Sequence, residues 1–232
     1  MVGNAHPTQE NIMITFSKDI DLLRWEPVLF GELALPSQRL CEGNDGAMAQ
    51  TTFTSAAADF TACDVHPGHV LCAHNADYSL QGCYEIVAVD PGAPGLTVSI
   101  LRADADAPTV APPAGTDLQF HISSYAPLAH EIAESLLQYF DLANLADEPE
   151  QILAQIANPQ SLRQTSVFGV LTAVFAARAT GANDPAGLWD KAMHYRKQFE
   201  TARARVRLQL DPNGDQIIDR THTGGSIRLR RA

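Results

Sequence analysis

Nine residues near one end of the chain, DPNGDQIID, have the residue types and spacing of a calcium-binding loop. Four oxygen-bearing side chains fall at positions 1, 3, 5 and 9 of such a loop: Asp211, Asn213, Asp215 and Asp219. Two positions that set the loop geometry differ, because Gln216 stands where glycine is needed and His222 where a bidentate glutamate is needed. Pro, Asn, Gly and Asp are also the residues of ordinary turns. The stretch is therefore either a calcium site or a turn.

A second segment, CDVHPGHVLCAH, concentrates thiols and imidazoles. Its candidate zinc ligands are Cys63, His66, His69 and Cys72, with His74 nearby. Zinc accepts four ligands of these types, but here one short segment would supply all of them around a Pro-Gly pair. The alternative is a turn followed by a strand. With no secretion signal in the sequence, we expect all four cysteines to be free thiols: Cys41, Cys63, Cys72 and Cys83.

Signs of nucleophilic catalysis are weak. The sequence has no G-x-S-x-G elbow and no G-x-x-x-x-G-K nucleotide loop. His130, Glu131 and Glu134 could form a site, but on an amphipathic helix they are more simply its polar face. We therefore expect a protein that is not an enzyme. One alternative is a calcium-binding interaction module that uses the loop at residues 211–219, and a hydrolase built around His66 and His69 is the less favoured one.

The elements that must position these residues divide the chain into three parts. Residues 1–125 contain short apolar stretches between Pro, Gly, Asn and Asp clusters, which predict an antiparallel β-barrel or sandwich. The expected strands are NIMITF, HVLCAH, GCYEIVAVD, LTVSILR and DLQFHISSY. Loops are expected at CEGNDGAMAQ and ADADAPTVAPPAG, and a hairpin-like connection at DPGAPG.

Residues 126–206 change to helical periodicity and predict a bundle of about four helices. The last helix has an apolar stripe with steps of three and four: Leu188, Ala192, Tyr195, Phe199, Ala202 and Val206. Residues 207–232 alternate again at VRLQL and SIRLRRA, which predicts a C-terminal β-hairpin or extended tail. The expected fold class is therefore α+β. An isolated hairpin would be marginally stable, so we expect this one to pair with another part of this chain or of a second chain.

Charge is divided unevenly along the chain. Residues 1–190 hold 6 Lys and Arg against 23 Asp and Glu, whereas residues 191–232 hold 10 against 4. An acidic body with a basic end suits head-to-tail contact between identical subunits and argues against sequence-specific nucleic-acid binding by the body. No apolar run approaches the roughly 20 residues that span a bilayer, and no signal peptide is visible, so we expect synthesis in the cytoplasm and no membrane partner.

The stretch AGLWDKAMHYRKQFETARARVRLQLDPNGDQIID resembles the head-to-tail connector, or adaptor, family of tailed-phage neck proteins. The likeness lies in an early Trp and Lys-Ala on a long helix, a YR..FE.A middle, an arginine-rich end, a short strand and a D.NGD turn. Residues 126–206 are similar to the helical body of such adaptors. The segments ADFTACDVHPGHVLCAH and GCYEIVAVD look like small β-domains of virion proteins, although short adaptors lack a large β-rich region.

This resemblance implies a non-catalytic virion protein that forms a ring of about a dozen copies beneath the portal. The implied partners are the portal, identical neighbours, a tail or stopper protein below, and DNA that passes through without sequence-specific binding. No cofactor is implied, although calcium at Asp211–Asp219 is possible. The residues expected to dock on an acidic partner are Arg220, Arg228, Arg230 and Arg231, which otherwise are solubilising surface arginines.

Overall fold

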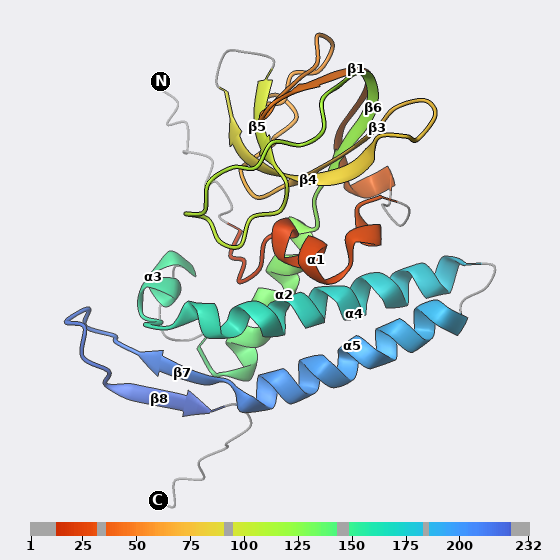
Figure 1. Ribbon diagram of the computed structural model, residues 1–232. Coiled ribbons are helices and arrows are strands. Elements are labelled where there is room, and N and C mark those ends of the chain that lie inside the picture. Colours follow the sequence, from red (N-terminus) through yellow and green to blue (C-terminus); the bar gives the residue numbers. More distant parts are fainter. Residues whose placement is uncertain (1–12, 32–35, 91–94, 143–148, 183–185, 224–232) are drawn as a thin grey trace, which may run out of the picture.

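The computed structural model describes residues 13–31, 36–90, 95–142, 149–182 and 186–223, and it has an α+β fold (Figure 1). Six antiparallel strands close into a barrel in the order β1-β2-β5-β4-β3-β6. The strands are β1 (Arg39–Ala49), β2 (Thr52–Thr54), β3 (Val70–His74), β4 (Gln81–Val89), β5 (Gly95–Ser99) and β6 (Gly115–Ser123). The sequence predicted either a barrel or a sandwich, and the structure shows a barrel.

Strand β1 corrects the prediction of a loop at CEGNDGAMAQ. Its two glycines lie under aromatic rings of the barrel interior, because a Cβ on Gly43 would come within 2.6 Å of Phe120 and one on Gly46 within 2.7 Å of Phe53. The pairing of β1 with β6 shifts register between these glycines, which marks a bulge. Residues typical of turns therefore serve here to bend a strand and to make room for two phenylalanines.

The expected strand NIMITF is also wrong within the described residues. Met13 to Phe16 form no strand, and Ile14 and Phe16 are buried with Ala133 and Leu136 of a helix. Their alternation reflects two side chains that enter a helical core rather than one face of a sheet. The chain then forms α1 (Asp19–Trp25), a short helix that the sequence did not predict.

The helical part contains α2 (Ala126–Tyr139), α3 (Pro149–Ala154), α4 (Arg163–Gly181) and α5 (Ala186–Arg205). The sequence predicted about four helices here, and with α1 the described chain has five α-helices. Figure 1 shows α4 and α5 side by side as a long antiparallel pair, with α1 between them and the barrel. Ala192 and Tyr195 of the predicted α5 stripe are buried in the core, and Phe199 packs against it. Strands β7 (Arg207–Leu210) and β8 (Arg220–Thr223) form a separate antiparallel pair.

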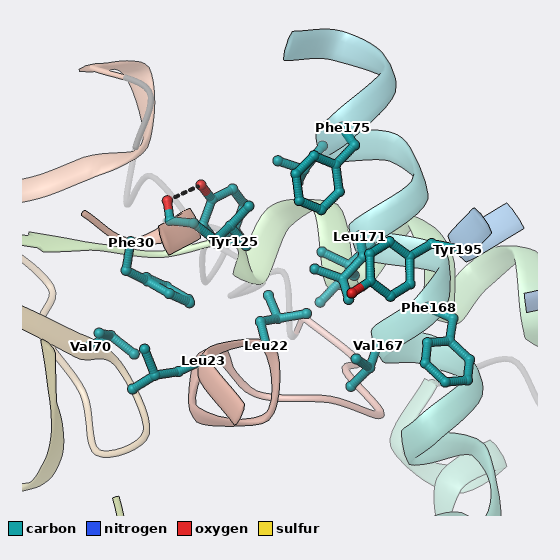
Figure 2. Packing of buried hydrophobic residues seen from close by; sticks show 14 of the residues in the cluster. Leu22, Leu23, Phe30, Val70, Tyr125, Val167, Phe168, Leu171, Phe175 and Tyr195 are labelled. Carbon is teal, nitrogen blue, oxygen red and sulfur yellow. Dashed lines mark hydrogen bonds between the residues drawn. The ribbon is translucent and has the colours of Figure 1, made fainter. Parts of the chain in front are cut away.

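A hydrophobic cluster built around α1 joins the barrel to the helices. Figure 2 shows Leu22 between Phe30 and Val70 on one side and Leu171 and Tyr195 on the other. All five side chains belong to one buried cluster. The barrel wall and the helices therefore share a core, and the proposed division into domains at residue 125 stays a prediction.

Polar contacts of α1 strengthen this junction. The carboxylate of Asp21 accepts a hydrogen bond from the Lys18 backbone at 3.0 Å and forms an ion pair with Arg163 at the start of α4. Glu26, directly after α1, accepts hydrogen bonds at 2.7 Å from Lys191 Nζ and from Tyr195 Oη of α5. Burial, together with the Glu26 carboxylate, raises the pKa of the Tyr195 phenol, which keeps it protonated as the donor.

Candidate functional site

The C-terminal hairpin is fixed to the helical body at its base. Leu208 and Leu210 of β7 are fully buried, in the same cluster as residues of α2 and α3. The segment before α4 pairs with the edge of β7, since Ala157 N donates to Gln209 O and Asp211 N donates to Gln155 O, both at 2.9 Å. In the described chain β7 thus has β8 along one edge and residues 155–158 along the other. This arrangement holds the hairpin in one direction.

The turn DPNGDQIID is organised by its first carboxylate. Asp211, only 9% exposed, accepts backbone hydrogen bonds from Gly214 at 2.8 Å, Asp215 at 3.2 Å and Gln216 at 2.7 Å. Gly214 and Gln216 both have positive φ angles, of 73° and 67°. The tight turn is therefore made by these two residues around a carboxylate that receives amide protons, which is an Asx-type turn.

The expected calcium ligands are not brought together by this turn. Asn213 donates to Asp215 at 3.1 Å, and both side chains are exposed, while Asp211 faces backbone amides. In the described ranges, no three His, Cys, Asp or Glu side chains are grouped so that they could hold a metal ion. Calcium binding by residues 211–219 stays a prediction, and it would require Asp211 to give up its amide partners.

The tip of the hairpin exposes apolar and basic side chains. Ile217 is 64% exposed and Ile218 is 41% exposed, although both are large hydrophobic residues. Arg220 begins β8 and is also exposed. Figure 1 shows this tip at one end of the helical layer, away from the barrel. The other predicted docking residues, Arg228, Arg230 and Arg231, lie outside the described residues.

A second exposed surface runs along α5. Trp189 and Met193 are 45% and 56% exposed and stand four residues apart, which places them on one face of the helix. Arg196 and Lys197 follow within two turns and are also exposed. The opposite side of α5 holds the buried stripe, so the helix presents a mixed apolar and basic surface to solvent.

The thiol- and imidazole-rich segment does not assemble as the sequence suggested. Cys72 forms a disulfide with Cys83, so the expectation of four free thiols is wrong for these two. They are directly opposed on neighbouring strands β3 and β4, a pairing that the residue spacing alone does not reveal. Cys41 and Cys63 are free, and burial beside Cys63 raises the pKa of the Cys41 thiol to about 12. Cys72 is therefore not available to a zinc site with Cys63.

The histidines of that segment interact locally. His66 Nε2 lies 2.8 Å from Asp64 Oδ1 at an exposed position, and the His66 backbone N donates to His69 Nδ1 at 3.1 Å. Burial, and then the proximity of His66, lowers the pKa of His69 to about 4, so this imidazole is neutral at physiological pH. On α2, His130 contacts the Ile14 carbonyl at 3.1 Å through Nδ1. These contacts, which are to backbone and carboxylate groups, orient the imidazoles.

Sequence reasoning missed a pocket of about 630 Å³ between the barrel wall and the segment after α1. Its apolar lining includes Leu23, Val28 and Ile100, and the disulfide and two imidazoles, His74 and His121, also line it. Val28, Tyr78 and Ile100 at this pocket are each more than 40% exposed. The pocket could not be found from the sequence because its lining depends on strand register: β3 and β6 pair so that Cys72 lies opposite His121.

Comparisons of the chain with family models, with characterised proteins and with solved structures gave no match. Among the described helices, none combines the length and apolarity that crossing a bilayer would require.

Proposed function

We propose that the chain is a non-catalytic assembly subunit, a head-to-tail adaptor that forms a ring beneath the portal of a tailed phage and links capsid to tail. The observation that carries the proposal is the hairpin, whose base is buried and whose tip exposes Ile217, Ile218 and Arg220. Exposed apolar side chains beside a positive charge are typical of a surface that another protein covers.

The charge of the rest of the chain supports an identical subunit as the partner of this tip. The first 190 residues carry 23 acidic and 6 basic side chains. Several of those basic groups are already paired within the subunit: Arg24 and Arg163 with Asp21, Arg39 with Glu42, and Arg102 with Glu85. The acidic excess therefore remains for contacts between subunits or for repelling DNA in a central channel, so that DNA slides through.

We propose strand addition at the hairpin of β7 and β8 as the mode of docking. Addition of a strand from the portal or from a neighbour would provide main-chain hydrogen bonds, and Arg220 would contribute charge complementarity. Three more arginines, Arg228, Arg230 and Arg231, follow in the sequence.

Size-exclusion chromatography with light scattering tests assembly of the purified chain, alone and mixed with the portal. The informative truncation ends at Thr223, because removal of 207–232 would also delete buried Leu208 and Leu210 and disturb the helical core. We expect the truncated chain and an Ile217→Ser, Arg220→Glu variant to stay folded and to lose assembly. Val110→Ser changes an apolar residue on a barrel loop that is 51% exposed, between the values of Ile217 and Ile218, and serves as the control.

Unchanged assembly by both altered chains, with folding confirmed by circular dichroism, would reject the hairpin as the docking element. A chain that stays monomeric with the portal present would reject the adaptor function itself.

A further inference from the structure

The outer wall of the barrel places two sulfur atoms and two imidazoles on three adjacent strands. Cys72 of β3 lies directly opposite Cys83 of β4 on one side and His121 of β6 on the other. His74 follows Cys72 by two residues on β3, and alternate residues of a strand share one face. All four side chains line the pocket of about 630 Å³ described above. The arrangement arises from strand register and joins residues up to 49 positions apart in the sequence.

Both imidazoles are already held in the manner of metal ligands. His121 Nε2 lies 2.6 Å from the Phe30 carbonyl, and His74 Nδ1 lies 3.0 Å from the Asn75 carbonyl. A carbonyl oxygen only accepts, so each of these nitrogens carries the proton in the contact. The other nitrogens, Nδ1 of His121 and Nε2 of His74, then have free lone pairs in the neutral rings. Histidines that bind metals usually donate their second ring N–H to a backbone carbonyl or carboxylate in this way.

A further contact fixes the position of the His74 ring. The His74 ring stacks on Tyr78 with centroids 4.4 Å apart and an angle of 8° between the planes. The wall thus holds two preoriented nitrogen donors next to a disulfide whose sulfurs are donors only after reduction.

We propose that reduction of this disulfide creates a zinc site on the barrel wall. Its ligands are Cys72, His74, Cys83 and His121. Two thiolates and two neutral imidazoles match a closed tetrahedral zinc site and suit zinc better than calcium or magnesium, which prefer oxygen. With the disulfide formed, as in this structure, no three His, Cys, Asp or Glu side chains of the described residues are grouped so that they could hold a metal ion. The disulfide and the zinc site are therefore mutually exclusive states of the same residues.

Conversion of the disulfide into the zinc site requires a thiol reductant of the glutathione or dithiol class. Its two electrons and two protons convert the Cys72–Cys83 disulfide into two thiols, and the reductant becomes a disulfide. Each thiol then releases its proton as Zn²⁺ binds the thiolate. Cys83 is only partly buried at the pocket, so a small reductant has a path to the sulfur. Oxidation reverses the sequence and releases the metal.

The test is metal titration of the full chain, oxidised and after anaerobic reduction, against a chromophoric zinc chelator. Cobalt is the second probe, because thiolate ligands give it a sulfur-to-metal charge-transfer absorption. The reduced protein is expected to bind one zinc per chain and the oxidised protein none. His74→Ala and His121→Gln should each weaken zinc binding by more than about 100-fold, since even second-shell changes cost about 10–100-fold.

Matched controls separate this site from the other thiols and histidines. Cys41→Ser with Cys63→Ser, and separately His66→Ala, should leave zinc affinity within a few-fold of the unaltered chain. The proposal is overturned if the reduced chain binds no zinc, if the oxidised chain binds it equally well, or if the control substitutions remove binding while His74→Ala does not. His74 is partly exposed, so its variant remains informative even where His121→Gln impairs folding.

Discussion

Replacement of Gly169 by alanine tests the close approach of three helices that supports the long α4–α5 pair. A Cβ at this position would lie 2.7 Å from Ile132 Cγ2 of α2 and 3.1 Å from Phe199 Cε2 of α5. The methyl of a β-branched isoleucine cannot rotate away freely, so the helices must shift. Overpacking of this kind costs about 1–3 kcal/mol.

The sign of the effect depends on a competing gain. Alanine in a helix interior is favoured over glycine by about 0.5–1 kcal/mol. The expected net change for Gly169→Ala is therefore a loss of about 1 kcal/mol, as the steric cost is the larger of the two. Gly187→Ala is the matched control, because nothing lies within 4 Å of a Cβ on this residue in the first turn of α5. Gly187→Ala should raise the free energy of unfolding by up to about 1 kcal/mol, because it gains helix propensity without a steric cost.

Urea unfolding followed by circular dichroism measures both variants. The two should differ by about 2 kcal/mol, or very roughly 4–8 °C in melting temperature for a chain of this size. Equal stabilisation by both alanines would refute the close packing of α2, α4 and α5 at Gly169.

Three further changes test the hairpin and the junction. Leu208→Ala should lower the free energy of unfolding by about 2–5 kcal/mol because it empties a fully buried position, whereas exposed Gln209→Ala should change it little. Asp211→Ala should cost about 1–3 kcal/mol and speed hydrogen exchange of the Gly214 amide, which loses its acceptor; unchanged exchange would contradict the turn. Burial raises the pKa of Asp19 to about 7, so the folded chain holds a proton that the unfolded chain releases near pH 4, and stability should fall as pH rises from about 4 to 7. Asp19→Asn should flatten this pH dependence. If urea titrations show the same dependence of stability on pH in the Asn variant, Asp19 is not its source.

The last helix, α5, was predictable because it buries one stripe and exposes its other side. The steps of three and four from Leu188 to Val206 indicated α5, and Tyr195 and Ala192 are buried as expected. Four of the five expected strands were found for a similar reason, since β3 to β6 have apolar residues that face the barrel interior. Local periodicity reports which side of an element is covered, and this information is contained in a short window.

The errors have a common physical origin in long-range packing. Gly43 and Gly46 suggested a loop, but the rings of Phe120 and Phe53 occupy the space that side chains would need. Ile14 alternates with Phe16 as in a strand, although both enter a helical cluster. The same holds for the candidate sites, because the Cys72–Cys83 disulfide depends on strand register and not on spacing.

The turn at DPNGDQIID could be predicted from the local sequence. Its Asp, Asn and Gly residues act on neighbours a few positions away, and Asp211 indeed bonds to the amides of residues 214–216. What the local pattern could not provide is the direction of the hairpin. That direction comes from burial of Leu208 and Leu210 and from pairing with residues 155–158.

The most direct test of the proposed function is the mass of the full chain in solution, measured by light scattering after size exclusion, alone and with the portal. The adaptor proposal predicts a closed ring of about a dozen copies, formed by the chain alone or on the portal, and its loss when the chain ends at Thr223. A strictly monomeric chain under both conditions would contradict the adaptor proposal, and a ring that survives both the truncation and the Ile217→Ser, Arg220→Glu change would contradict docking through the hairpin.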